Sequence, residues 1–273
     1  MIKSILAACT GEKPSTRSIE YAVDMAVHFD AHLTGILPLR VGLDQMGVPG
    51  WLSGDLKSMI ADTIKTKNSH IREQFEVLAR EKLSAERVHW IDSNDTANQT
   101  LVNYARMYDL TVVASPPEKW SASDIKPDVV ALQSGLPILV VPDETQIATG
   151  SKPAVVAWDG QRSATRALRD ALPLLAKRPF VSVYTVENSR VRGPLPGIDV
   201  VKVLERHGIK VERHRDPQER GSVSEQIMQH CRDINAGLLV MGAYEHSKFS
   251  EDLFGGVTQD TVKNTTLPVL LSH

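Results

Sequence analysis

Short apolar runs and longer amphipathic segments alternate along the chain. In the first half, the apolar runs predict strands at residues 2–9, 31–39, 87–91, 109–115 and 136–142. The segments between them repeat apolar residues at helical spacing. The longest such segment runs from residue 56 to residue 82 and is predicted to carry on one face Met59, Ile60, Ile64, Ile71, Phe75 and Leu78. This alternation predicts parallel strands joined by helices.

The same pattern restarts after a polar segment at residues 143–153 that contains glycine and proline. Further apolar runs predict strands at residues 154–158, 180–186, 238–241 and 267–271, and the repeated order adds a third strand at residues 210–214. Ser222 and Glu225 have the spacing of a capping box that opens a helix. In both halves a Leu-Pro pair precedes the last strand, in GLPILVVP and in TLPVLLSH. The chain is therefore predicted to contain the same order of elements twice.

That order predicts an α/β fold with two tandem doubly wound domains. Each domain is expected to contain a parallel five-stranded sheet with helices on both of its faces. We expect the first domain at residues 1–143 and the second at residues 152–273.

A loop punctuated by glycine follows the predicted strand at residues 238–241. It begins at Gly242 and ends at the pair Gly255-Gly256, after which a short helix and the last strand follow. Parallel sheets use this layout to hold phosphate, because glycines let backbone N–H groups approach an anion and the helix N-terminus adds its positive end. The loop is therefore a candidate phosphate-binding site.

The second half resembles the universal stress protein (UspA-like) family over its whole length. The resemblance rests on the motifs VVAWDG, LLVMGAYEHS, LFGGVT and LPVLL. The first half is similar to a diverged copy, so the whole chain resembles a tandem universal stress protein. The resemblance implies a role in the stress response and a Rossmann-like fold of the adenine-nucleotide α-hydrolase type. Family members that bind ATP carry a G-x2-G-x9-G-[S/T] loop and an Asp after the first strand.

For the second half, the resemblance implies a site for ATP, with magnesium, or for a related adenine nucleotide. Asp159 matches the acidic residue that hydrogen-bonds the adenosine moiety, and Val186 would meet the adenine. The loop residues of this site are Gly242, Glu245, His246, Gly255, Gly256 and Val257.

The loop departs from the family pattern at two positions. Glu245 replaces the second glycine, and Gly256 replaces a Ser or Thr. A carboxylate about 4 Å from a phosphate oxygen costs roughly 1 kcal/mol in bulk water and about four times that near a protein surface. His246 and Lys248 partly offset this charge. Two alternatives stay open: a working nucleotide site, or a vestigial loop whose glycines only shape the turn.

The first half lacks the corresponding residues. Thr10 replaces the Asp, and Ser115, followed by two prolines, replaces the first loop glycine. The prolines remove backbone donors that a phosphate would need. We expect no ATP binding in this half.

Composition and charge exclude other classes of function. The chain has 31 Lys and Arg against 33 Asp and Glu, and its tryptophans are not interleaved with basic residues, so nucleic-acid binding is not predicted. No apolar run approaches the roughly 20 residues that span a bilayer, so no membrane association is predicted. Cys9 and Cys231 lie in apolar contexts far apart, which is typical of buried thiols in a reducing cytoplasm.

No catalytic residue or metal site is predicted, since the nine histidines show no zinc spacing with a third ligand and no nucleophile elbow or Walker lysine loop occurs. The hypotheses are a nucleotide-responsive stress protein, a protein-interaction module that has lost nucleotide binding, and a slow ATP hydrolase. Enzymatic activity is thus left undecided. By resemblance, the last strands of the two halves, at residues 138–141 and 269–271, pair as an internal pseudo-dimer. A homodimer and an unidentified protein partner are further alternatives.

Overall fold

The computed structural model of the protein describes residues 1–10, 13–38, 53–92, 97–117, 125–145, 150–189, 191–193, 195–218, 221–243 and 256–273. The elements of the first half are β1 (Ser4–Ala8), α1 (Lys13–Phe29), β2 (His32–Leu37), α2 (Gly54–Arg80), β3 (Val88–Asp92), α3 (Ala97–Ala105), β4 (Leu110–Ala114), α4 (Pro127–Ser134) and β5 (Ile138–Val141). Those of the second half are β6 (Ala154–Ala157), α5 (Arg162–Leu175), β7 (Val181–Glu187), α6 (Val200–Arg206), β8 (Val211–Pro217), α7 (Val223–Asp233), β9 (Leu238–Gly242), α8 (Gly256–Asn264) and β10 (Val269–Ser272).

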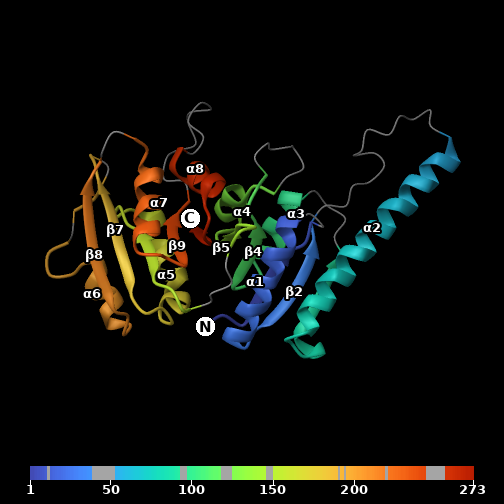
Figure 1. Ribbon diagram of the computed structural model, residues 1–273, viewed down its shortest axis with the longest axis horizontal. Coiled ribbons are helices and arrows are strands. Elements are labelled where there is room, and N and C mark those ends of the chain that lie inside the picture. Colours follow the sequence, from blue (N-terminus) through green and yellow to red (C-terminus); the bar gives the residue numbers. More distant parts are fainter. Residues whose placement is uncertain are drawn as a thin grey trace.

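The strands form one sheet in the order β3-β2-β1-β4-β5-β10-β9-β6-β7-β8 (Figure 1). Within each half the paired strands are parallel and follow the same order, so the predicted doubly wound α/β fold is confirmed. The halves join where β5 and β10 pair antiparallel, with Leu139 opposite Leu270. The predicted pairing of the two last strands is therefore confirmed. The domain boundaries stay a prediction.

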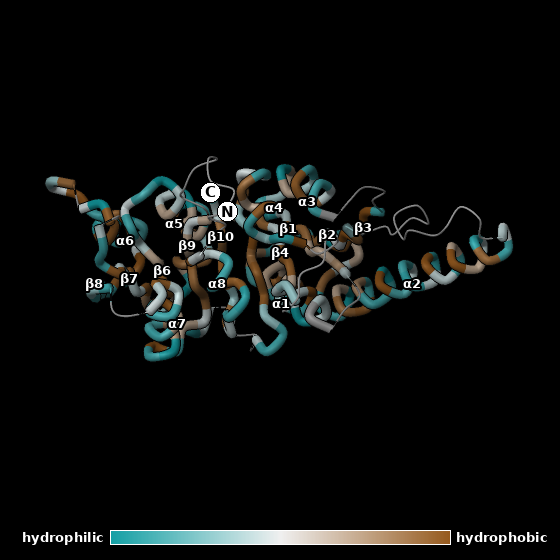
Figure 2. Tube along the Cα trace, turned by 90° about the horizontal axis from the view of Figure 1, so that it is seen from above, coloured by the Kyte–Doolittle hydropathy of each residue, from teal (hydrophilic) through white to brown (hydrophobic). Residues whose placement is uncertain are grey.

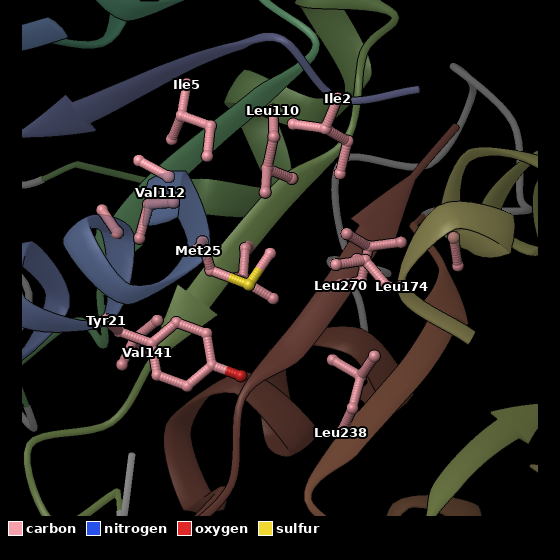
Figure 3. Packing of buried hydrophobic residues seen from close by; sticks show 14 of the residues in the cluster. Ile2, Ile5, Tyr21, Met25, Leu110, Val112, Val141, Leu174, Leu238 and Leu270 are labelled. Atoms are coloured by element: carbon pink, nitrogen blue, oxygen red, sulfur yellow. The ribbon is translucent and has the colours of Figure 1, made fainter. Parts of the chain in front are cut away.

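Helices cover both faces of the sheet. One buried cluster unites α1, α2, α5 and α6 with the strands, and a second unites α3, α4, α7 and α8 with the opposite face. Figure 3 shows side chains of the first cluster on both sides of the join between the halves, with Met25 of α1 and Val141 of β5 on one side and Leu270 of β10 on the other. Because both faces are covered, the central strands are mostly apolar and stand out in the sequence, whereas the edge strands β3 and β8 are polar and more exposed.

Helix α2 differs from its prediction. Ile71 and Phe75 are buried and Leu78 packs against the core, but Met59, expected on the same buried face, is 66% exposed. Figures 1 and 2 show that α2 extends outward past the strands at the β3 edge of the sheet. The apolar spacing indicates a helix correctly, but spacing alone does not say how much of the helix lies against the sheet.

A buried arginine links the two halves. Arg178 is 8% exposed and donates to the carbonyl oxygen of Lys152 at 3.2 Å, and its guanidinium interacts electrostatically with the phenol of Tyr21 in α1. Burial lowers the pKa of Arg178, and burial, opposed by Arg178, raises the pKa of Tyr21. One polar contact thus fixes α1 of the first half against the start of the second.

Three sequence features can be compared directly with the structure. Ser222 and Glu225 form the predicted capping box at the start of α7. Cys9 and Cys231 are buried free thiols, as their apolar contexts predicted, and burial raises the pKa of Cys231 to about 12. Over the described residues, the helices are all too short or too polar to span a bilayer.

Candidate nucleotide-binding crevice

The strand order of the second half reverses between β6 and β9, which lie side by side. From β6 the chain continues to β7 and β8 on one side, and it later returns to β9 and β10 on the other. In doubly wound sheets, ligands bind outside the carboxyl ends of the strands at such a reversal. The candidate site is therefore the place at the carboxyl ends of β6 and β9 where Asp159 and Gly242 lie, and we refer to this place as the crevice.

Asp159 follows β6 and shapes the start of α5. Its Oδ1 accepts a hydrogen bond from the backbone N–H of Gln161 at 2.9 Å. This contact satisfies a backbone donor beside the first turn of α5, where such donors have no partner within the helix. The Asp159 side chain is half-buried, so the carboxylate is fixed at the edge of the crevice.

The segment after β7 closes over this turn. The backbone N–H of Arg192 donates to the carbonyl oxygen of Asp159 at 2.8 Å. Gly160 has φ +78°, and a side chain there would place Cβ 2.9 Å from the carbonyl oxygen of Arg192. Only glycine fits this position without strain. The turn after β6 and the segment after β7 therefore form one wall of the crevice.

Gly242 ends β9 and touches the start of α5. A Cβ at this position would lie 2.6 Å from Ser163 Oγ and 2.7 Å from the backbone nitrogen of Ala164. The sequence interpretation assigned this glycine to phosphate approach. The structure gives it a packing role as well, because α5 can lie this close to β9 only where no side chain intervenes.

The other residues predicted for the site differ in their burial and in whether the structure describes them. Val186 is 6% exposed and belongs to the core cluster on the α7 face, so little of its side chain is open to a base. Gly256 is the first residue of α8, and a Cβ at this position would meet no described residue within 4 Å. Val257 is partly buried against the core. Glu245, His246 and Gly255 lie outside the described residues.

Sequence reasoning missed two residues beside the crevice. Arg162 is the first residue of α5, and its Nη2 lies 3.3 Å from Nε2 of His273. His273 in turn contacts the carbonyl oxygen of Ala243, which follows Gly242. These residues are 111 positions apart in the chain, and no motif connects them. The pairing of β9 with β10 and the packing of α5 on both strands bring them together.

The first half has different chemistry at the corresponding place. Thr10 stands where the second half has Asp159, and its backbone N–H donates to Ser15 Oγ at 3.0 Å. The hydroxyl of Ser115 is buried and, within the described part of the chain, has no hydrogen-bond partner. Neither Thr10 nor Ser115 has a carboxylate that could bind a ribose. The expectation that this half binds no ATP remains a prediction.

A polar cluster under α7 lies apart from the crevice. His230 stacks on Tyr184 with ring centroids 4.2 Å apart, and its Nε2 lies 2.8 Å from Ser182 Oγ. The ring of His214 lies 4.9 Å away. Burial, and after it the neighbouring His214, lowers the pKa of His230. Across the described ranges, no group of three potential metal ligands occurs here or elsewhere.

We expect the free energy of unfolding to decrease as the pH falls below about 6.5, because unfolded His230 takes up a proton there while folded His230 resists it. Chemical denaturation at about pH 7.5 and about pH 5.5 measures the difference. His230→Gln should remove part of this pH dependence, whereas His207→Gln, at an exposed position, should keep it. An identical pH dependence in His230→Gln and the wild type would contradict the assignment.

Comparison with known proteins identifies relatives of this chain. The universal stress protein family model matches residues 150–273. A universal stress protein of Synechocystis sp. is 29% identical over 137 residues, which cover 49% of this chain and 46% of that protein. The aligned region thus spans about half the length of that relative.

Solved structures show the same fold at low sequence identity. A universal stress protein from Archaeoglobus fulgidus has a TM-score of 0.70 and 14% identity, covering 98% of this chain and 95% of that one. This likeness supports the Rossmann-like architecture. A universal stress protein solved in complex with cAMP has a TM-score of 0.33 and 20% identity, covering 45% of this chain and 97% of that one. At that score the likeness says nothing of the ligand of this chain.

Proposed function

Since residues 150–273 belong to the universal stress protein family, we propose that the second half of this chain binds ATP or a related adenine nucleotide. The site is the crevice at the carboxyl ends of β6 and β9. The observation that carries the proposal is the placement of Asp159 and Gly242 together at the reversal of strand order. A triphosphate would bring magnesium with it.

We assign the site a binding role in a cytoplasmic stress-response protein. Bound nucleotide would bias association with a protein partner by stabilising one state of the crevice. Calorimetric or thermal-shift titration with ATP, ADP and AMP, with and without magnesium, tests the proposal. A nucleotide at 100 times its dissociation constant should stabilise the fold by about 2.7 kcal/mol. No stabilisation by any of the three nucleotides would overturn the proposal.

Substitutions of Asp159 separate its contribution to nucleotide binding from its contribution to the stability of the fold. Asp159→Asn keeps an oxygen that can accept from the Gln161 N–H but lacks the charge, so it should weaken nucleotide binding about ten-fold while leaving stability nearly unchanged. Asp159→Ala should weaken binding at least as much and also lower the free energy of unfolding by about 1 kcal/mol, the usual cost of a lost helix-start contact. Titration calorimetry and denaturant unfolding measure the two effects. Unchanged affinity in both variants would exclude Asp159 as a ligand.

A second candidate function is a protein-interaction module that has lost nucleotide binding. It is favoured by Glu245, which stands where the family has a glycine, and by the packing of Gly242 on α5, which explains that glycine without a phosphate. The two candidates make opposite predictions for Glu245→Gly. If the wild type binds no nucleotide and the variant does, the second candidate is the correct one.

A further inference from the structure

Arg162 is held in place at the edge of the crevice. His273 Nδ1 lies 2.7 Å from the carbonyl oxygen of Ala243, and a carbonyl oxygen can only accept, so Nδ1 carries the proton. A guanidinium can only donate, so Nε2 of the same ring accepts from Nη2 of Arg162 at 3.3 Å. These two contacts fix the guanidinium beside the carboxyl end of β9.

The positive charge of Arg162 is unfavourable for the stability of α5, the helix to which it belongs. Arg162 is the first residue of α5, and the first turn of α5 contains no acidic residue. The N-terminus of a helix carries a partial positive charge, so a cation there is unfavourable and an anion is stabilised. Asp159 is the nearest acidic residue before the helix, and its Oδ1 already accepts from Gln161. An anionic ligand at this place would therefore interact favourably with both Arg162 and the helix.

A buried hydroxyl on β10 is a second observation that indicates a ligand at this place. Ser272 pairs in register with Gly242, so its side chain lies on the same face of the sheet as the Cβ that Gly242 lacks. That face meets Ser163 at the start of α5. Ser272 is fully buried, and among the residues described its Oγ has no hydrogen-bond partner. Buried hydroxyls without a partner are rare in folded proteins, so this group is a candidate donor for a ligand.

We propose that Arg162, positioned by His273, binds the anionic group of the ligand in this crevice. The guanidinium can donate two parallel hydrogen bonds to a phosphate, a geometry that no other side chain supplies as well. Through Arg162 of α5, the site would then bind a nucleotide more tightly than the uncharged nucleoside. This inference rests on the proposed nucleotide site and adds the residue that distinguishes a phosphorylated ligand.

The experiment compares adenosine, AMP and ATP by titration calorimetry on the full chain. Arg162→Gln should weaken binding of AMP and ATP at least about ten-fold and leave adenosine binding unchanged, since only the phosphorylated ligands carry the anion. Arg162→Lys should recover part of the loss, because an ammonium group keeps the charge without the paired donors. Arg169→Gln is the matched control, since it removes the same charge from an exposed position farther along α5 and should change none of the affinities.

The outcomes separate this inference from the proposed function. If Arg162→Gln weakens adenosine and AMP binding equally, or weakens neither, the role of Arg162 is overturned while the nucleotide site stands. If the wild type binds neither adenosine nor a nucleotide, the proposed function is overturned and this inference with it. Thermal unfolding of each variant without ligand checks that a loss of affinity does not come from a loss of folding.

Discussion

Gly242→Ala is expected to lower the free energy of unfolding by about 2 kcal/mol, within the usual range for an overpacked core. The added Cβ would lie 2.6 to 2.7 Å from Ser163 and from the backbone nitrogen of Ala164, so α5 would have to move. Gly256→Ala is the matched control, because its Cβ meets no described residue within 4 Å and alanine suits a helix. The control should be neutral or stabilising by up to about 1 kcal/mol. Denaturant unfolding measures both variants.

The stabilities of Gly242→Ala and Gly256→Ala also determine what a loss of nucleotide binding in either variant means. A shift of α5 in Gly242→Ala would displace Arg162 and the turn that Asp159 caps, so reduced nucleotide affinity would not show that Gly242 contacts phosphate. Gly256 lies in the same predicted loop without this packing role. If Gly242→Ala and Gly256→Ala prove equally stable, the close contact with α5 does not constrain residue 242.

The fold was predictable because its signals are local. Buried parallel strands are continuous apolar runs, and the Leu-Pro pair before each last strand marks β5 and β10 as equivalent. The extent of α2 that lies against the sheet was not predictable, since the apolar face of α2 continues past the strands to the exposed Met59. A sequence pattern records which face of a helix is apolar, not what lies opposite it.

The candidate site was predictable only in part. Asp159 and Gly242 follow apolar runs and match family motifs, so their place at the strand ends could be inferred. The contact of Gly242 with α5 depends on how closely a helix approaches a strand, which no local pattern specifies. Arg162 and His273 meet because β10 lies beside β9 and α5 packs on both strands, so they could be found only in three dimensions.

Residues 150–273 expressed without the first half are expected to form a dimer through β10. In the full chain, β10 is buried and pairs antiparallel with β5, with Leu270 opposite Leu139. Removing β5 leaves an apolar edge with unpaired backbone groups, and such edges recruit another strand. A second β10 can take the place of β5 in the same antiparallel geometry. Light scattering coupled to size exclusion should then give twice the mass of the fragment.

Substitution of Leu270 tests whether β10 forms the contact. Leu270→Lys in the fragment places a charge on the core-facing side of the edge strand and should shift the fragment to monomer or to unfolded chain, which circular dichroism distinguishes. Leu195→Lys, at a position 72% exposed and remote from β10 in sequence, should leave the dimer intact. A wild-type fragment that stays monomeric and folded would show that β10 tolerates an open edge. The two halves would then be held together by packing in the shared core cluster more than by completion of the sheet.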